Sequence, residues 1–248
     1  MNEKKDVIRP TDAEAISLSK KLVRTAHFGA LAVLDPQDGS PFVSRAGVAT
    51  LMDGTPIILV SLLSQHTQAI LADARCSLLL GEPGKGDPLA YPRLSLVCRA
   101  QKIERDTPAY ETARRRYLNR HQKAKLYVGL GDFNFFALQI SHASLNGGFG
   151  KAYRLTADDL LTIGPASELD EVEQATLDAI NEQHPVEVER FARAAGAKGE
   201  RFRLVGIGAD GIDIASERGF YRLEYSNYLK NAKDLLRNLV ITCEYRGC

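Results

Sequence analysis

The chain has 248 residues, of which 44% are hydrophobic and 25% are charged, so it is long enough and apolar enough to bury a sizeable core. Its 32 Lys and Arg residues nearly balance its 31 Asp and Glu residues, which gives a formal net charge of +1. This balance provides no long-range attraction toward polyanions. We therefore expect no nucleic acid partner, and any bound anion requires a specific pocket.

The sequence carries no signal for secretion or membrane insertion. The opening segment "MNEKKDVIRP" is charged and has no apolar core. The longest apolar run, "PIILVSLL", is far shorter than the roughly 20 residues that span a bilayer. The four cysteines stand too far apart for a CxxC pair and are typical of reduced thiols. We expect a cytoplasmic protein without a membrane partner.

The first part of the chain is predicted to be rich in β-strands. Helices are expected near residues 11–26, 65–74 and 108–122. Apolar and β-branched runs between turn residues predict five or six strands, over residues 28–34, 41–50, 56–63, 76–82, 93–105 and 133–141. Mostly antiparallel strands with few helices between them favour a closed barrel over a βαβ sheet.

The sequence pattern changes after residue 155. Two amphipathic helices are expected over residues 166–184 and 185–196, followed by short strands over residues 201–207, 211–216 and 220–225. The sequence therefore predicts an α+β protein of two parts. A barrel domain occupies residues 1–155, and a smaller α+β domain occupies residues 156–248.

Two glycine-rich segments have some features of nucleotide-binding motifs. "GIGADG" at residues 206–211 matches GxGxxG, yet an alternating β-branched run follows it where a helix is required. We interpret Asp210 and Gly211 as a hairpin turn. "GGFGK" at residues 147–151 lacks the first glycine and the final Ser or Thr of a P-loop, so its glycines are interpreted as a turn between the domains.

Polar residues gather where the strand over residues 56–63 passes into the next helix. Hydroxyls and an imidazole beside helix N-terminal N–H groups form a compact anion site, and the candidates are Ser61, Ser64, Gln65, His66 and Thr67. The alternative is ordinary capping by Ser64 with an exposed His66. Arg45 favours the anion site, because a lone arginine in an otherwise uncharged strand requires an anionic partner such as phosphate.

Three further features of the sequence could each have a functional role or a purely structural one. Arg93 and Ser95 begin a strand and face the same side, although Arg93 also suits a surface strand end. The basic run over residues 113–125 is expected to form a solvated helix face, because the net charge is near zero. His184 has no second ligand at zinc spacing, so no metal site is assigned.

The order of these motifs resembles the pyridoxamine 5′-phosphate oxidase-like split-barrel flavoproteins, and within them the haem-utilisation branch. The resemblance rests on Arg45 in its strand and on the segments "SLLSQHT", "PRLSLVCRA", "RYLNRHQKAKLYVGLGDFNFF" and "NGGFGKAYRL". It implies a homodimer of six-stranded antiparallel split β-barrels with flanking helices. It also implies FMN in a groove between the subunits, with the phosphate held by Arg45 and the Ser64–Thr67 segment. Ser61 would lie beneath the flavin ring, and Arg93 and Ser95 would touch flavin or substrate from the partner.

The haem-utilisation branch further implies haem at the dimer interface and oxidative opening of its ring. Haem iron needs an axial side chain, and the candidates here are His142 and His184. Three functions stay open, and no catalytic residue is predicted. The first is an FMN-dependent oxidoreductase in redox or haem-iron handling. The second is a haem-binding or haem-degrading protein without a working flavin site, which His66 favours because other members often carry a cation there. The third is a non-enzymatic carrier of flavin or haem.

Overall fold

A nine-stranded sheet forms the larger part of the computed structural model, which describes residues 8–148, 151–164 and 166–231. Its strands are β1 (Ile8–Arg9), β2 (Phe28–Leu34), β3 (Pro41–Gly47), β4 (Ala49–Thr50), β5 (Pro56–Ser61), β6 (Arg75–Leu80), β7 (Arg93–Ile103), β8 (Phe133–Asn146) and β9 (Ala152–Thr156). The α+β class is confirmed. The expected count of six strands is too low, because the short strands β1, β4 and β9 add to the six longer ones, and β1 pairs with β9 in parallel.

The hydrogen-bonded pairing of the strands nearly closes on itself. From one end to the other, β3 pairs with β2, β2 with β6, β6 with β7, β7 with β8, β8 with β5, and β5 with β4. The two ends, β3 and β4, form no ladder within the described residues but are consecutive in the chain, separated only by Val48, whose backbone N–H donates to the His27 carbonyl at 2.9 Å. The sheet therefore curls into the predicted barrel, and the chain itself joins the two ends of the ladder.

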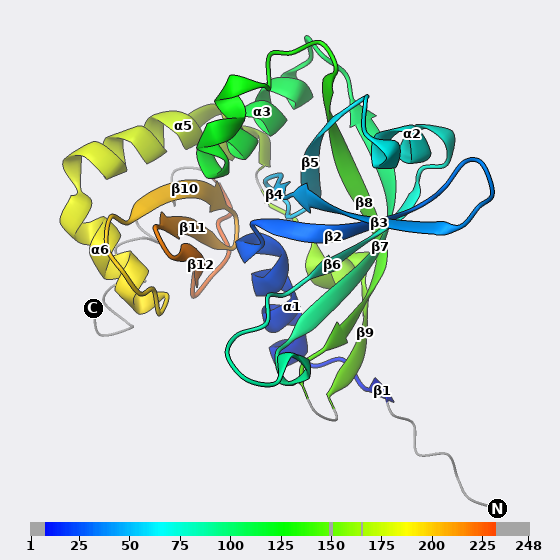
Figure 1. Cartoon of the computed structure of the whole chain (residues 1–248). Helices are drawn as coiled ribbons and strands as arrows, with labels where there is room; N and C mark the ends of the chain where they lie inside the picture. Colours follow the sequence, from blue (N-terminus) through cyan, green and yellow to red (C-terminus); the bar gives the residue numbers. More distant parts are fainter. Residues whose placement is uncertain (1–7, 149–150, 165, 232–248) are drawn as a thin grey trace, which may run out of the picture.

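Helices cover the barrel and the C-terminal sheet (Figure 1). They are α1 (Ala13–Thr25), α2 (Gln65–Ala72), α3 (Pro108–Arg120), α4 (Ala157–Leu160), α5 (Ala166–Gln183) and α6 (Pro185–Ala194), with 3₁₀ turns at Pro88–Ala90 and Gln122–Leu126. Alternate residues of each strand fill the barrel interior, among them the fully buried Leu31, Leu78, Leu96 and Leu138.

The C-terminal part builds a second sheet of three antiparallel strands, β10 (Arg203–Gly208), β11 (Gly211–Ser216) and β12 (Gly219–Glu224). Helices α5 and α6 pack against it. Gly208 pairs with Gly211 across the turn, which confirms the predicted hairpin and rules out a dinucleotide loop. The predicted domain boundary falls at the end of β9, and residues 232–248 of the predicted second domain lie outside the described residues.

Buried ion pairs join the barrel to this second sheet. Arg222 of β12 is fully buried, pairs with Asp210, and lies 2.5 Å from Asp213. Arg24 reaches Asp210 from α1, at 3.4 Å. Thr162 Oγ1 donates to the second oxygen of Asp210 at 2.7 Å. Charges this deeply buried are stable only when they are paired.

The arginine-rich helix α3 supplies the rest of this network. Arg116 is paired with Glu173 of α5, and both side chains are buried. Arg120 donates to the Arg24 carbonyl at 2.6 Å and lies 3.9 Å from Asp213. The expectation of a solvated face was therefore wrong for Arg116 and Arg120. Near-zero net charge does not determine which individual charges a fold buries.

No helix within the described ranges is both long and apolar enough to span a lipid bilayer.

Removing one carboxylate of the buried network should destabilise the protein strongly. Asp213→Ala leaves Arg222 without its 2.5 Å partner, so we expect the free energy of unfolding to fall by about 3–5 kcal/mol. Glu189→Ala breaks only the exposed Arg193–Glu189 pair and should cost at most about 1 kcal/mol. Urea denaturation measures both free energies of unfolding. If Asp213→Ala loses no more stability than Glu189→Ala, the buried network does not stabilise the protein.

Candidate functional site

The polar corner between β5 and α2 is a closed hydrogen-bond network. Ser64 Oγ lies 2.7 Å from the Ser61 carbonyl oxygen, 2.9 Å from His66 Nε2 and 2.7 Å from Thr67 Oγ1. The other ring nitrogen of His66 lies 3.0 Å from Ser44 Oγ on β3. The fold brings these predicted residues together, and their hydroxyls and imidazole already satisfy one another.

Electrostatics at this corner do not favour a phosphate. Ser61 Oγ donates to Asp132 at 2.5 Å, and Gln65 Nε2 donates to Asp35 at 2.8 Å, so two carboxylates border the corner. Burial lowers the pKa of His66, so its imidazole is neutral near pH 7 and adds no positive charge. The predicted corner therefore does not fit an FMN phosphate within one subunit.

Arg45 lies on the other face of β3 from the corner. Ser44 faces His66, and successive strand residues point to opposite faces, so Arg45 points outward. Its guanidinium carbon lies 4.8 Å from the centre of the Phe28 ring, and it borders a hollow of about 390 Å³. Arg45 and the Ser64–Thr67 segment therefore do not line one pocket of a single subunit.

The strand register places other predicted residues on the outward face that carries Arg45. One row across the sheet consists of Arg45, Ala30, Leu79, Ser95, Ser144 and Arg154. The adjoining row consists of Val43, Ala32, Ser77, Val97, His142 and Thr156. We call these two rows the outer sheet face. Arg93 lies at its edge and donates to the Leu89 carbonyl at 3.1 Å.

His184 lies apart from these residues. It is exposed at the N-terminus of α6, where Nδ1 is 3.9 Å from Glu187. Within the described part of the chain, no three His, Cys, Asp or Glu side chains gather closely enough to hold a metal ion. A protein-bound metal cluster is therefore not supported by these residues.

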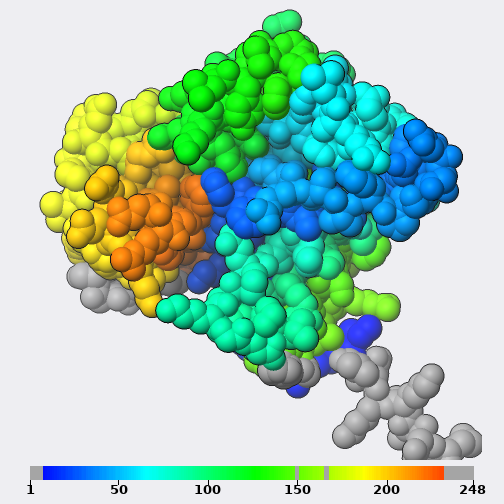
Figure 2. All heavy atoms as spheres, in the orientation of Figure 1, coloured from blue at the N-terminus to red at the C-terminus, as the bar shows by residue number. Residues whose placement is uncertain are grey.

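A groove of about 720 Å³ separates the barrel from the C-terminal sheet, and we call it the interdomain groove. Its walls include His27, Phe28, His121, Arg218 and Phe220. A smaller hollow of about 280 Å³ adjoins it, and Phe28 also borders the hollow on the outer sheet face. Figure 2 shows the orange C-terminal sheet against the blue N-terminal segment and the green segment of α3.

Four aromatic rings stack in a column along this groove. The ring centres of Tyr117 and His121 are 4.3 Å apart, those of His121 and His27 are 4.5 Å apart, and those of His27 and Phe220 are 5.1 Å apart. The Arg120 guanidinium carbon lies 4.4 Å from the Phe220 ring centre. Because the column joins His27, directly before β2, and the end of α3 to Phe220 of β12, it fixes the groove walls relative to one another.

Both histidines of the column are neutral at pH 7. His121 Nε2 donates to the Val48 carbonyl at 2.8 Å, and burial lowers the pKa of His121 to about 4. Burial also lowers the pKa of His27, and the nearby Arg120 charge acts in the same direction.

The remaining charges of the groove are mostly positive. Its cations outside the ring column are Lys123, Arg201, Arg203 and Arg218, and its acids are Glu82 and Glu217. Arg201 lies 3.9 Å from Glu217, and Arg203 donates to the Asn119 carbonyl at 2.9 Å. Lys123 and Arg218 form no ion pair with a carboxylate of the described residues. An aromatic wall with a cationic rim suits an organic anion built on a ring system.

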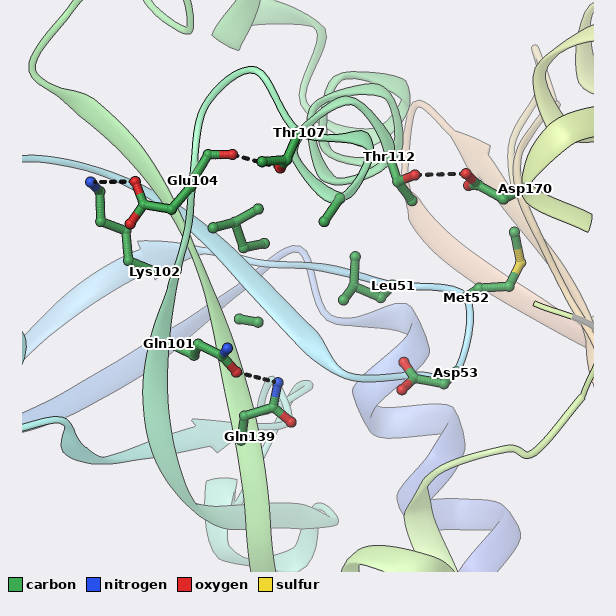
Figure 3. A pocket seen from close by; sticks show the side chains of 13 residues that line it. Leu51, Met52, Asp53, Gln101, Lys102, Glu104, Thr107, Thr112, Gln139 and Asp170 are labelled. Atoms are coloured by element: carbon green, nitrogen blue, oxygen red, sulfur yellow. Dashed lines mark hydrogen bonds and ion pairs between the residues drawn. The ribbon is translucent and has the colours of Figure 1, made fainter. Parts of the chain in front are cut away.

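Another hollow, of about 680 Å³, lies between α3 and the outward surface of β7 and β8 (Figure 3). Its polar residues pair with one another: Lys102 with Glu104 at 3.0 Å, Gln101 with Gln139 at 3.3 Å, and Thr112 with Asp170 at 2.7 Å. Leu51, Ile103, Ala109 and Ala137 supply apolar surface between them. This hollow therefore offers less charge to an anion than the interdomain groove does.

The residues that build the interdomain groove were not predicted from the sequence. His27 and His121 follow no ligand spacing, and Phe220 belongs to the separate C-terminal sheet. A histidine directly before an aromatic strand start, as in "AHFGAL", is a weak signal that only the fold can interpret.

Comparisons place this geometry among known β-barrels. The family described as CREG, beta-barrel, matches residues 10–161. The crystal structure of the protein Atu2129 from Agrobacterium tumefaciens, of unknown function, is 34% identical with a TM-score of 0.84, covering 95% of this chain and 98% of that one. A heme binding protein from Mycobacterium smegmatis is 23% identical with a TM-score of 0.55, over 97% of this chain and 99% of that one. At this identity the likeness concerns the fold alone.

A curated relative adds a named activity. The chloroplastic "Non-canonical heme oxygenase HOZ" of Arabidopsis thaliana is 34% identical over 105 residues, which are 41% of this chain and 30% of that protein. The matched region is thus less than a third of the Arabidopsis protein. Together the comparisons confirm the predicted β-barrel, while the haem-utilisation branch stays a prediction.

The pH dependence of stability tests the buried state of His121. Its folded pKa of about 4 lies below the unfolded value of 6.5, so the neutral form stabilises the fold above pH 6.5 and that stability is lost as the pH falls toward 4. The loss amounts to about 3 kcal/mol. His121→Phe keeps a ring in the column and should unfold with a shallower pH dependence between pH 7 and 4. If the free energy of unfolding falls equally with pH in the wild type and in His121→Phe, His121 is not a buried neutral histidine.

Proposed function

The chain belongs to the CREG β-barrel family, and we propose that it binds haem in the interdomain groove and takes part in haem degradation. The observation that carries this proposal is the groove itself, with its aromatic wall, its excess of cations and its volume of about 720 Å³. Ligand pockets of drug-sized molecules span about 300–1,000 Å³. The Arabidopsis relative, which is named a heme oxygenase, supports the same proposed function.

The residues of the groove fit the chemistry of haem. Haem is a flat aromatic ring with two carboxylates, so it matches a groove lined by aromatic side chains beside cations that have no carboxylate partner within the described residues. Bound haem iron would supply the oxygen chemistry, and the chain would orient the ring, hold the carboxylates and limit access of water. These contributions require only side chains that already line the groove.

An FMN-dependent oxidoreductase is the second candidate function. It is favoured by Arg45, which borders the hollow of about 390 Å³ and forms no ion pair within the described residues. A phosphate at Arg45 would need its other donors from a partner subunit, because the Ser64–Thr67 corner lies on the other face of β3.

Spectroscopic titration separates these candidates. Haemin added to the purified protein should give a perturbed Soret band that saturates at one equivalent per chain, whereas FMN should leave its flavin band unchanged. Subsequent addition of ascorbate in air should bleach the Soret band if the protein degrades haem, and a persistent band would indicate a carrier. If the protein binds FMN but does not bind haemin, the haem proposal is contradicted and Arg45 is supported as a phosphate ligand.

The predicted homodimer would use the outer sheet face. Three of its large apolar side chains are exposed in the single chain: Val43 by 59%, Leu79 by 43% and Val97 by 37%. Apolar side chains gathered on one exposed face are typical of an interface. Sedimentation velocity should therefore show a dimer for the wild type and a monomer for Leu79→Asp. The control Leu126→Asp, at an 85% exposed position outside this face, should remain dimeric. A monomeric wild type would contradict the prediction.

A further inference from the structure

His27 differs from His66 and His121 in the hydrogen bonding of its ring nitrogens. Neither of them forms a hydrogen bond within the described residues, although the two faces of the ring are covered by His121 and Phe220. In contrast, both nitrogens of His66 contact serine hydroxyls. His121 donates to a backbone carbonyl. The stack thus holds the His27 ring in place while its edge stays available to a ligand.

The rings of His142 and His184 also form no hydrogen bond within the described residues, but their surroundings differ. His142 lies exposed on the outer sheet face, and His184 lies exposed at the N-terminus of α6, 3.9 Å from Glu187. His27 instead lines both the interdomain groove and the adjoining hollow of about 280 Å³. A ligand that His27 contacts would therefore lie inside a concave site.

Two cations of the groove remain for a carboxylated ligand. Arg201 and Arg203 already have protein partners at 3.9 and 2.9 Å. Lys123 and Arg218 have no carboxylate partner within the described residues, and both line the groove that His27 lines. A charged side chain bound to a carboxylate is a strong contact, particularly where water is partly excluded.

We propose that His27 is the axial ligand of haem iron in the interdomain groove, and that Lys123 and Arg218 hold the haem carboxylates. This inference rests on the proposed function and deepens it. It replaces the ligand candidates taken from the sequence resemblance: His142 lies on the outer sheet face, and His184 does not line the groove.

Two porphyrins test the two halves of this proposal separately. Haemin reports iron ligation, whereas metal-free protoporphyrin IX carries the same carboxylates and no iron. His27→Phe keeps the ring stack and removes the nitrogens. We expect this variant to lose the Soret signature of a histidine-ligated haem and to bind haemin at least about tenfold more weakly, while its affinity for protoporphyrin IX stays within about twofold.

A double variant tests the contacts that Lys123 and Arg218 make with the haem carboxylates. Lys123→Ala combined with Arg218→Ala should weaken the binding of haemin and of protoporphyrin IX by about tenfold or more, because the lost contacts do not involve iron. His184→Ala is the control for loss of an imidazole and should match the wild type. Thermal unfolding of each apo variant shows that the fold is retained.

The outcomes distinguish this inference from the proposed function. If the wild type binds haemin and His27→Phe keeps the wild-type Soret band, the inference is overturned while haem binding stands. Loss of the band in His142→Phe alone would likewise overturn it and place the haem on the outer sheet face. If the wild type binds neither porphyrin, the proposed function itself fails.

Discussion

Arg222 lies buried between Asp210 and Asp213 of its own part of the chain, and arginines of α1 and α3 connect the barrel to this cluster. Arg24 of α1 reaches the same Asp210, and Arg120 of α3 approaches Asp213. The desolvation cost of each charge is offset only while its partners stay in place. The two parts of the chain are therefore held in one relative position by the ion pairs that cross between them, Arg24 with Asp210, Arg116 with Glu173 and Arg120 with Asp213.

This constraint also sets the geometry of the interdomain groove. Arg120 belongs to the buried network and covers the Phe220 ring at 4.4 Å, so the network positions the end of the ring column. The column in turn fixes His27, whose ring has protein on both faces. The way in which barrel and sheet are joined thus holds the His27 imidazole in place beside cations that have no carboxylate partner in the described part of the chain.

Features with local causes could be predicted from the sequence, and features with long-range causes could not. The hairpin at Asp210 follows from β-branched alternation after "GADG", and the Ser64–Thr67 corner assembles from neighbours in the chain. The two carboxylates beside that corner, Asp35 and Asp132, arrive from distant turns and change its electrostatics. Burial of Arg116 and Arg120 depends on acids of the second domain, and the pairing of His27 with His121 depends on barrel closure.

Crystals soaked with haemin and measured at the iron absorption edge would locate the iron directly. We expect one anomalous iron peak per chain in the interdomain groove, within coordination distance of a His27 ring nitrogen. The haem carboxylates should lie toward Lys123 and Arg218. An iron peak on the outer sheet face beside His142, or FMN density beside Arg45 with an empty groove, would show that the interdomain groove is not the haem site.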